Sequence, residues 1–215
     1  MLDDVVVEPA FAGEPKNAVI ILHGLGDCAS GIIGLGEAFR PALPNTVFHA
    51  PNAPFPCDFS PFGFQWFGGQ DWSPAVVLTG IQKAAPMLNE YIDHVLATHK
   101  LTADKLALVG FSQGTMMSLH VAPRREEKLA CVVGYSGALV EPELLPKERK
   151  SAPPVLLVHG THDDVVPFAS MNYALAGLHS ANINASGVPC EGVMHSINDK
   201  GVEQGALFLR KALGY

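Results

Sequence analysis

The strongest constraint on the fold is a set of short apolar runs that each lead into a glycine. The four clearest are residues 18–22, 106–109, 130–133 and 155–158. A weaker run covers 46–50, and a further one spans 183–188. Uninterrupted apolar runs of this kind, without polar alternation, are typical of strands that are covered on both faces. The runs therefore predict the strands of a buried sheet.

Helical periodicity separates these predicted strands. Apolar side chains return every three or four residues from Val77 to Leu96 and again from Val202 to Leu213, as expected for helices with one buried face. Strands that alternate with helices predict βαβ units, and hence a mostly parallel sheet with helices on both faces. Because no internal repeat is evident, we expect residues 1–215 to form a single α/β domain.

Composition excludes several classes of function. The net charge of -7 argues against nucleic-acid binding, which needs a basic face. The four cysteines are far apart and form no C-x-x-C pair, so neither a zinc site nor a thiol redox motif is expected. The first residues do not resemble a signal peptide, and no apolar run reaches the roughly 18 residues of a membrane span. We expect a cytoplasmic protein without stable membrane insertion.

Residues 51–72 form an unusual aromatic segment. They hold seven of the seventeen aromatic residues of the chain, together with scattered prolines and glycines. A long segment without regular structure is uncommon unless it binds a ligand or covers a site. Two interpretations follow: a loop packed on the sheet edge, or the wall of an apolar substrate pocket.

Nucleophilic catalysis is indicated by Gly110-Phe111-Ser112-Gln113-Gly114, which follows a predicted strand and opens a predicted helix. In that context G-x-S-x-G is a nucleophile elbow, whose sharp turn exposes the serine hydroxyl at the carboxyl end of the strand. The backbone N–H of Gln113 is then placed to donate to an oxyanion. The alternative is a serine that only caps the helix.

A serine nucleophile needs a base and an orienting acid, which follow it in the order Ser, Asp or Glu, His in this class of sheet. His195 lies after the last apolar run and just before the last predicted helix, where the base is expected. Asp163 and Asp164 both leave the strand at 155–158, and their positions alone do not distinguish them. Activity should then rise between about pH 6 and 7.5, as a histidine base loses its proton.

The second oxyanion donor is expected in the loop His23-Gly24-Leu25-Gly26-Asp27, which follows the strand at 18–22. Its glycines allow the backbone to approach a substrate closely. We expect His23 to order this loop through hydrogen bonds rather than to act as the base.

These motifs together resemble the phospholipase/carboxylesterase family of small α/β-hydrolases, which includes bacterial carboxylesterases and acyl-protein thioesterases. The resemblance rests on residues 23–27, 65–67, 110–114 and 160–167 and on Met194-His195, in that order along the chain. It implies an α/β-hydrolase fold and places the catalytic acid at Asp163. It further implies that the Leu25 and Gln113 amides form the oxyanion hole and that Leu25 and Trp66 border the acyl site.

The expected function is that of a serine carboxylesterase that acts on small-molecule esters through an acyl-enzyme, without a metal or an organic cofactor. Only about 17 residues separate Gly137 from the strand at 155, too few for a large cap domain. The site should therefore be open and favour short to medium acyl chains. The alternatives are an acyl-protein thioesterase, a lysophospholipase and a catalytically inactive binding module. Apolar surface around residues 51–72 would also suit a homodimer.

Overall fold

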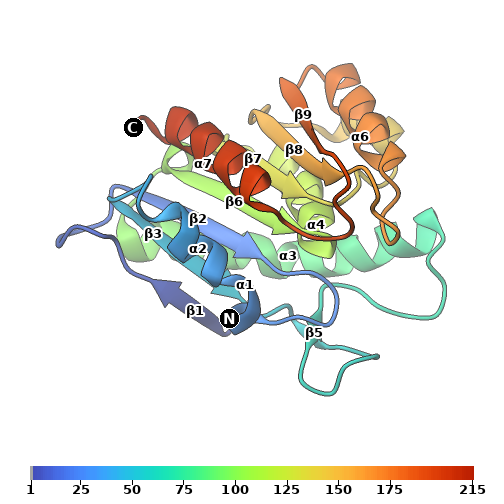
Figure 1. Ribbon diagram of the computed structural model, residues 1–215, viewed down its shortest axis with the longest axis horizontal. Helices are drawn as coiled ribbons and strands as arrows, with labels where there is room; N and C mark the ends of the chain where they lie inside the picture. The colour runs from blue at the N-terminus through green and yellow to red at the C-terminus, as the bar shows by residue number, and fades with distance from the viewer. Residues whose placement is uncertain (1) are drawn as a thin grey trace.

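The computed structural model describes residues 2–215, which surround one seven-stranded sheet (Figure 1). Met1, the first residue of the predicted domain, lies outside the described part. The strand order is β1-β3-β2-β6-β7-β8-β9, and every pair is parallel except that of β1 with β3. The strands are β1 (Asp4–Val7), β2 (Asn17–Leu22), β3 (Thr46–Pro51), β6 (Leu106–Phe111), β7 (Cys131–Tyr135), β8 (Val155–Gly160) and β9 (Ala185–Cys190).

Each predicted apolar run is a strand of this sheet. All residues of β2, β3, β7 and β8 are buried, which explains why these segments carry no polar alternation. Strands β6, β7 and β8 extend to or through their glycines Gly110, Gly134 and Gly160, whereas β2 ends at Leu22, before Gly24. The carboxyl ends of β6, β7 and β8 consequently lie side by side at one edge of the sheet.

Helices cover both faces of the sheet, as predicted (Figure 1). The apolar side chains of β2 alternate between the two layers: Val19 and Ile21 pack in one core, while Ile20 and Leu22 pack in the other. The first layer holds α1 (Ala29–Ile32), α2 (Gly34–Phe39) and α7 (Asp199–Leu213). The second holds α3 (Pro74–His99), α4 (Gln113–Val121), α5 (Leu145–Glu148) and α6 (Ala169–Ser180). Within residues 2–215, no helix is long and apolar enough to cross a membrane.

Strand β1 was not predicted from the sequence. Its Val5 and Val6 are exposed, so this edge strand contains no buried apolar run. Instead, a partly buried polar cluster ties it to the rest of the protein: Asp4 Oδ2 accepts hydrogen bonds from His49 Nδ1 in β3 and from Tyr91 OH in α3. Polar contacts between distant segments leave no periodic signal in the sequence.

The aromatic segment contains a small hairpin outside the main sheet, in which β4 (Phe55–Pro56) pairs with β5 (Phe64–Gln65). Both interpretations of the segment hold in part. Trp66 is fully buried, whereas Phe67 and Trp72 line a cavity. Phe59 and Phe62 belong to neither group, because their side chains are exposed.

The connection between β7 and β8 contains only the 3-10 turn η3 (Pro142–Leu144) and the four-residue α5. The remaining 3-10 turns, η1 (Ala103–Lys105) and η2 (Ala122–Arg124), adjoin β6 and α4. The predicted absence of a large cap domain is confirmed for this connection, and the carboxyl edge of the sheet stays accessible.

Candidate active site

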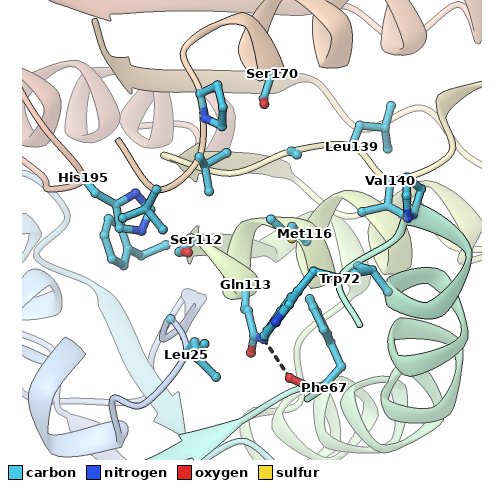
Figure 2. Close-up of a pocket in the computed structure, with 18 of the residues that line it drawn as sticks. Leu25, Phe67, Trp72, Ser112, Gln113, Met116, Leu139, Val140, Ser170 and His195 are labelled. Carbon is cyan, nitrogen blue, oxygen red and sulfur yellow. Dashed lines mark hydrogen bonds between the residues drawn. The ribbon is translucent and has the colours of Figure 1, made fainter. Parts of the chain in front are cut away.

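Ser112 occupies a strained turn between β6 and α4. Its φ of 53° and ψ of -114° lie where non-glycine residues are rare. Glycines make the turn possible, because a Cβ on Gly114 would lie 2.1 Å from the Leu22 carbonyl oxygen and one on Gly110 would lie 2.4 Å from the Gly114 carbonyl carbon. The strain is thus maintained by the close packing of the start of α4 on β2 and β6, and Ser112 lines a cavity at the carboxyl edge of the sheet (Figure 2).

His195 lies in the loop between β9 and α7 and lines the same cavity (Figure 2). This loop packs directly on the end of β8: the His162 N–H donates to the Val193 carbonyl at 3.0 Å, and a Cβ on Gly160 would lie 2.2 Å from that oxygen. The imidazole rests on the Phe111 ring, with 4.9 Å between the ring centroids. The residue before the serine therefore helps to hold the histidine beside it.

Asp163 and Asp164 have different environments. The Asp163 side chain is fully buried, and its two oxygens lie 3.0 and 2.8 Å from His195 Nδ1. Asp163 Oδ1 also accepts hydrogen bonds from the backbone N–H groups of Val165 and Val166. Asp164 is exposed. The structure thus brings Asp163 to His195, which is the choice that the family resemblance implied.

The charge of Asp163 is set by these contacts. Burial alone would raise the pKa of its carboxyl, but the hydrogen bonds from His195 and from the Val166 and Val165 amides outweigh burial and lower the pKa. Asp163 is therefore an acceptor only, and His195 Nδ1 must carry the hydrogen that it donates. This arrangement leaves His195 Nε2 free to accept a proton from a nucleophile.

Two backbone N–H groups are available near Ser112 for an oxyanion. Gly26 N and Asp27 N hold their loop by donating to the carbonyls of Phe64 and Gly24. Among the described residues, no acceptor is assigned to the Leu25 amide in that loop. Gln113 is the first residue of α4, so its amide has no acceptor within the helix. Both residues line the cavity, so both amides stay candidates for the predicted oxyanion hole.

His23 orders the loop that carries Leu25. Its Nδ1 donates to the Gly24 carbonyl at 2.7 Å, and its Nε2 accepts from the Ala53 N–H at 2.9 Å. Burial lowers the pKa of His23, which keeps the ring neutral. Trp66 Nε1 donates to the His23 carbonyl at 3.1 Å.

Trp66 corrects one expectation. It was predicted to border the acyl site, but its side chain is fully buried and does not line the cavity. The Trp66 indole is directed to the His23 carbonyl, so this side chain supports the loop that carries Leu25 instead of contacting a ligand in the cavity. From the aromatic segment, Phe67 and Trp72 line the cavity instead, and their rings pack edge to face with centroids 6.3 Å apart.

The side chain of Gln113 is a feature that the sequence analysis missed. Its Oε1 accepts from the Trp66 N–H at 3.1 Å, and its Nε2 donates to the Phe67 carbonyl at 2.7 Å (Figure 2). The residue after the nucleophile thus connects the elbow to the aromatic segment. The G-x-S-x-G pattern leaves this position open, so only the structure reveals the connection.

Replacement of Gln113 by leucine is expected to lower kcat about tenfold while KM changes little, because the elbow loses its support and two buried backbone groups lose partners worth about 1–3 kcal/mol each. The measurement is steady-state hydrolysis of a p-nitrophenyl ester together with thermal unfolding. Gln82→Leu, at an exposed position of α3, is the matched control. Equal kinetics for the two variants would contradict a role for the Gln113 side chain.

The cavity has a volume of about 790 Å³ and mostly apolar walls. Its polar lining residues are Ser112, Gln113, Ser170 and His195, and its acidic lining residues are Asp27 and Glu141. Among the described residues no lysine or arginine lines it. The apolar walls are formed by Leu25, Phe67, Trp72, Pro74, Val77, Phe111, Met116, Ala138, Leu139, Val140, Pro142, Val165, Val166 and Pro167.

Comparison with known proteins identifies the family. The model of the phospholipase/carboxylesterase family matches residues 3–213. The chain belongs to this family. Among its relatives, acyl-protein thioesterase 1 of Schizosaccharomyces pombe is 29% identical over 93% of this chain and 91% of its own length. The esterase YpfH of Escherichia coli is 24% identical over 87% of this chain and 79% of its own length.

Solved structures agree with this assignment. The crystal structure of esterase PE8 superimposes with a TM-score of 0.94 and 37% sequence identity, and the match covers 99% of both chains. The resemblance inferred from the motifs is therefore confirmed, as is the α/β-hydrolase fold. The protein is a member of a hydrolase family whose relatives include esterases and acyl-protein thioesterases.

Proposed function

We propose that this protein is a serine carboxylesterase that hydrolyses neutral esters with short to medium acyl chains. The observation that carries the proposal is the pairing of buried Asp163 with half-buried His195 beside a strained Ser112, in a cavity with apolar walls. A nucleophile, an oriented base and a site for the acyl group are the parts that acyl transfer requires.

In the proposed reaction, Ser112 Oγ attacks the ester carbonyl carbon while His195 Nε2 takes the hydroxyl proton. Asp163 holds the imidazole in the required tautomer and stabilises its positive charge. The amides of Leu25 and Gln113 donate to the developing oxyanion. His195 then gives the proton to the departing alcohol, and a water molecule repeats the sequence on the acyl-enzyme to release the acid.

The choice of substrate class rests on the cavity lining. Its apolar walls suit an acyl chain, and no large cap closes the site over a long one. The described lining contains two acidic residues, Asp27 and Glu141, and no lysine or arginine, and this charge balance disfavours an anionic leaving group. A phosphate-bearing lysolipid is therefore a poorer candidate than a neutral ester.

Butyryl glycerol and butyryl glycerol 3-phosphate share the same ester bond, and we expect kcat/KM to be about tenfold lower for the phosphate ester at low salt. The difference should shrink at high salt, because the carboxylates at the cavity are then screened. A phosphate ester that reacts as fast as the neutral one would contradict the proposed preference. A series of p-nitrophenyl esters from acetate to palmitate tests the preferred chain length, with a maximum expected below the long chains.

Thioester hydrolysis is a second candidate, favoured by the relatives whose name is acyl-protein thioesterase 1. The same nucleophile, base and oxyanion donors cleave both bonds, so a thioester and an oxygen ester of one acyl chain are compared directly. Turnover of neither would favour an inactive binding module. Three further expectations stay predictions: a cytoplasmic location, catalysis without a metal or an organic cofactor, and a homodimer formed through the exposed Phe59 and Phe62.

A further inference from the structure

His159 is a buried histidine that the proposed reaction leaves without a role. It lies near the end of β8 and is 2% exposed. Its ring meets the Phe168 ring edge to face, with 6.0 Å between centroids and an interplanar angle of 79°. It does not line the cavity. Its imidazole is therefore held rigidly next to the loop that carries Asp163, out of reach of a substrate.

The ring of His159 anchors that loop. Its Nε2 lies 2.8 Å from the Val166 carbonyl oxygen. Because a carbonyl only accepts, Nε2 must carry the hydrogen. The N–H of the same Val166 donates to Asp163 Oδ1 at 2.8 Å. His159 thus holds Val166 by its carbonyl group, and the N–H of Val166 in turn holds the Asp163 carboxylate.

The same nitrogen lies close to the other carboxylate oxygen. His159 Nε2 is 3.3 Å from Asp163 Oδ2, the oxygen that accepts from His195 Nδ1 at 2.8 Å. The Asp163 side chain is completely buried, so protein donors rather than water must stabilise its charge. The N–H dipole of His159 contributes to that stabilisation at Oδ2, whereas the two backbone amides donate to Oδ1.

We propose that His159 is a positioning residue, which holds Asp163 in the orientation that His195 requires by anchoring the turn at residues 163–166. The inference rests on the proposed esterase mechanism, because the effect reaches the reaction only through Asp163 and His195. Loss of the His159 N–H should lower kcat and leave KM nearly unchanged, since the substrate never contacts this side chain.

A double-mutant cycle tests the proposal. His159→Phe should lower kcat about tenfold or more in the wild-type background and less than about twofold in the Asp163→Ala background, because a residue that acts through Asp163 has nothing left to position. His159→Gln, which keeps a donor near the Nε2 position, should restore kcat to within about threefold. His179→Phe is the matched control, since it removes a ring contact of 2.9 Å to the Ala185 carbonyl at an exposed site.

Equal losses in both backgrounds, or a glutamine variant as impaired as the phenylalanine variant, would overturn the proposal. If thermal unfolding shows that His159→Phe does not fold, His159→Asn takes its place. The shorter asparagine amide lies near the Nδ1 position, so this variant also lacks a donor at the Nε2 position. The downfield NMR signal of the His195 Nδ1 hydrogen gives a readout independent of substrate. It should be lost in His159→Phe and kept in His159→Gln, even if the wild type hydrolyses no ester and the proposed function fails.

Discussion

Replacement of Ser112 by alanine is expected to reduce ester hydrolysis by roughly 10⁴-fold or more, the loss typical of a missing triad nucleophile. Ser112 is the hydroxyl at the strained elbow, and the cavity that it lines is also lined by His195. No acyl-enzyme forms without it, so only binding and the oxyanion donors remain to assist water. The measurement is kcat on p-nitrophenyl butyrate for purified wild type and variant.

Ser170→Ala provides the matched control, because Ser170 is a second hydroxyl in the same cavity at the start of α6. Its removal should change kcat/KM less than about threefold, as for a wall residue that only contacts substrate. Comparable losses for the two variants, or turnover that survives in Ser112→Ala, would refute Ser112 as the nucleophile.

Asp163→Asn is expected to lower kcat by about 10⁴-fold with little change in fold, because the amide favours the wrong tautomer of His195. The side chain keeps its volume in the buried site, yet it no longer compels Nδ1 to carry the hydrogen. Asp164→Asn makes the same chemical change at the adjacent exposed position and should retain nearly full activity. A stronger effect at Asp164 than at Asp163 would contradict the assigned acid.

The pH dependence of the wild type should show one acidic limb. The pKa of Asp163 is lowered, so this carboxyl is already ionised below its usual titration range, near pH 3.9, and stays ionised throughout an assay above pH 5. The acidic limb should therefore come from the base that accepts the Ser112 proton and not from Asp163. Constant kcat/KM down to pH 4, measured with a neutral ester, would exclude a histidine base.

The sheet was predictable because parallel strands that are buried on both faces must be apolar throughout. The runs at 18–22, 106–109, 130–133 and 155–158 all proved to be such strands. Edge strand β1 was not predicted, since its exposed valines pair with β3 through backbone bonds and its anchor is a single aspartate. Helix α3 begins at Pro74, before the predicted Val77, because its first turn is largely exposed and shows no apolar period.

The roles of Ser112 and His195 were inferred from their order along the chain and from the strands that precede them, whereas Asp163 was chosen over Asp164 only through the family resemblance. The contacts that support these residues were not predicted. Those of Gln113 with residues 66 and 67 join segments far apart along the chain, and that of His159 with Val166 closes a loop whose residue pattern does not indicate it. Trp66 was misplaced for the same reason. An aromatic residue in a motif gives no sign of which side of a loop it faces.

The central claim, that this chain forms an acyl-enzyme on Ser112, is tested most directly by peptide mass spectrometry after brief incubation with a fluorophosphonate probe. We expect one phosphonyl group per protein on the peptide that contains Ser112, its formation slowed strongly in His195→Ala and in Asp163→Asn. Labelling of any other residue, or no labelling of folded protein that is active on esters, would contradict the account.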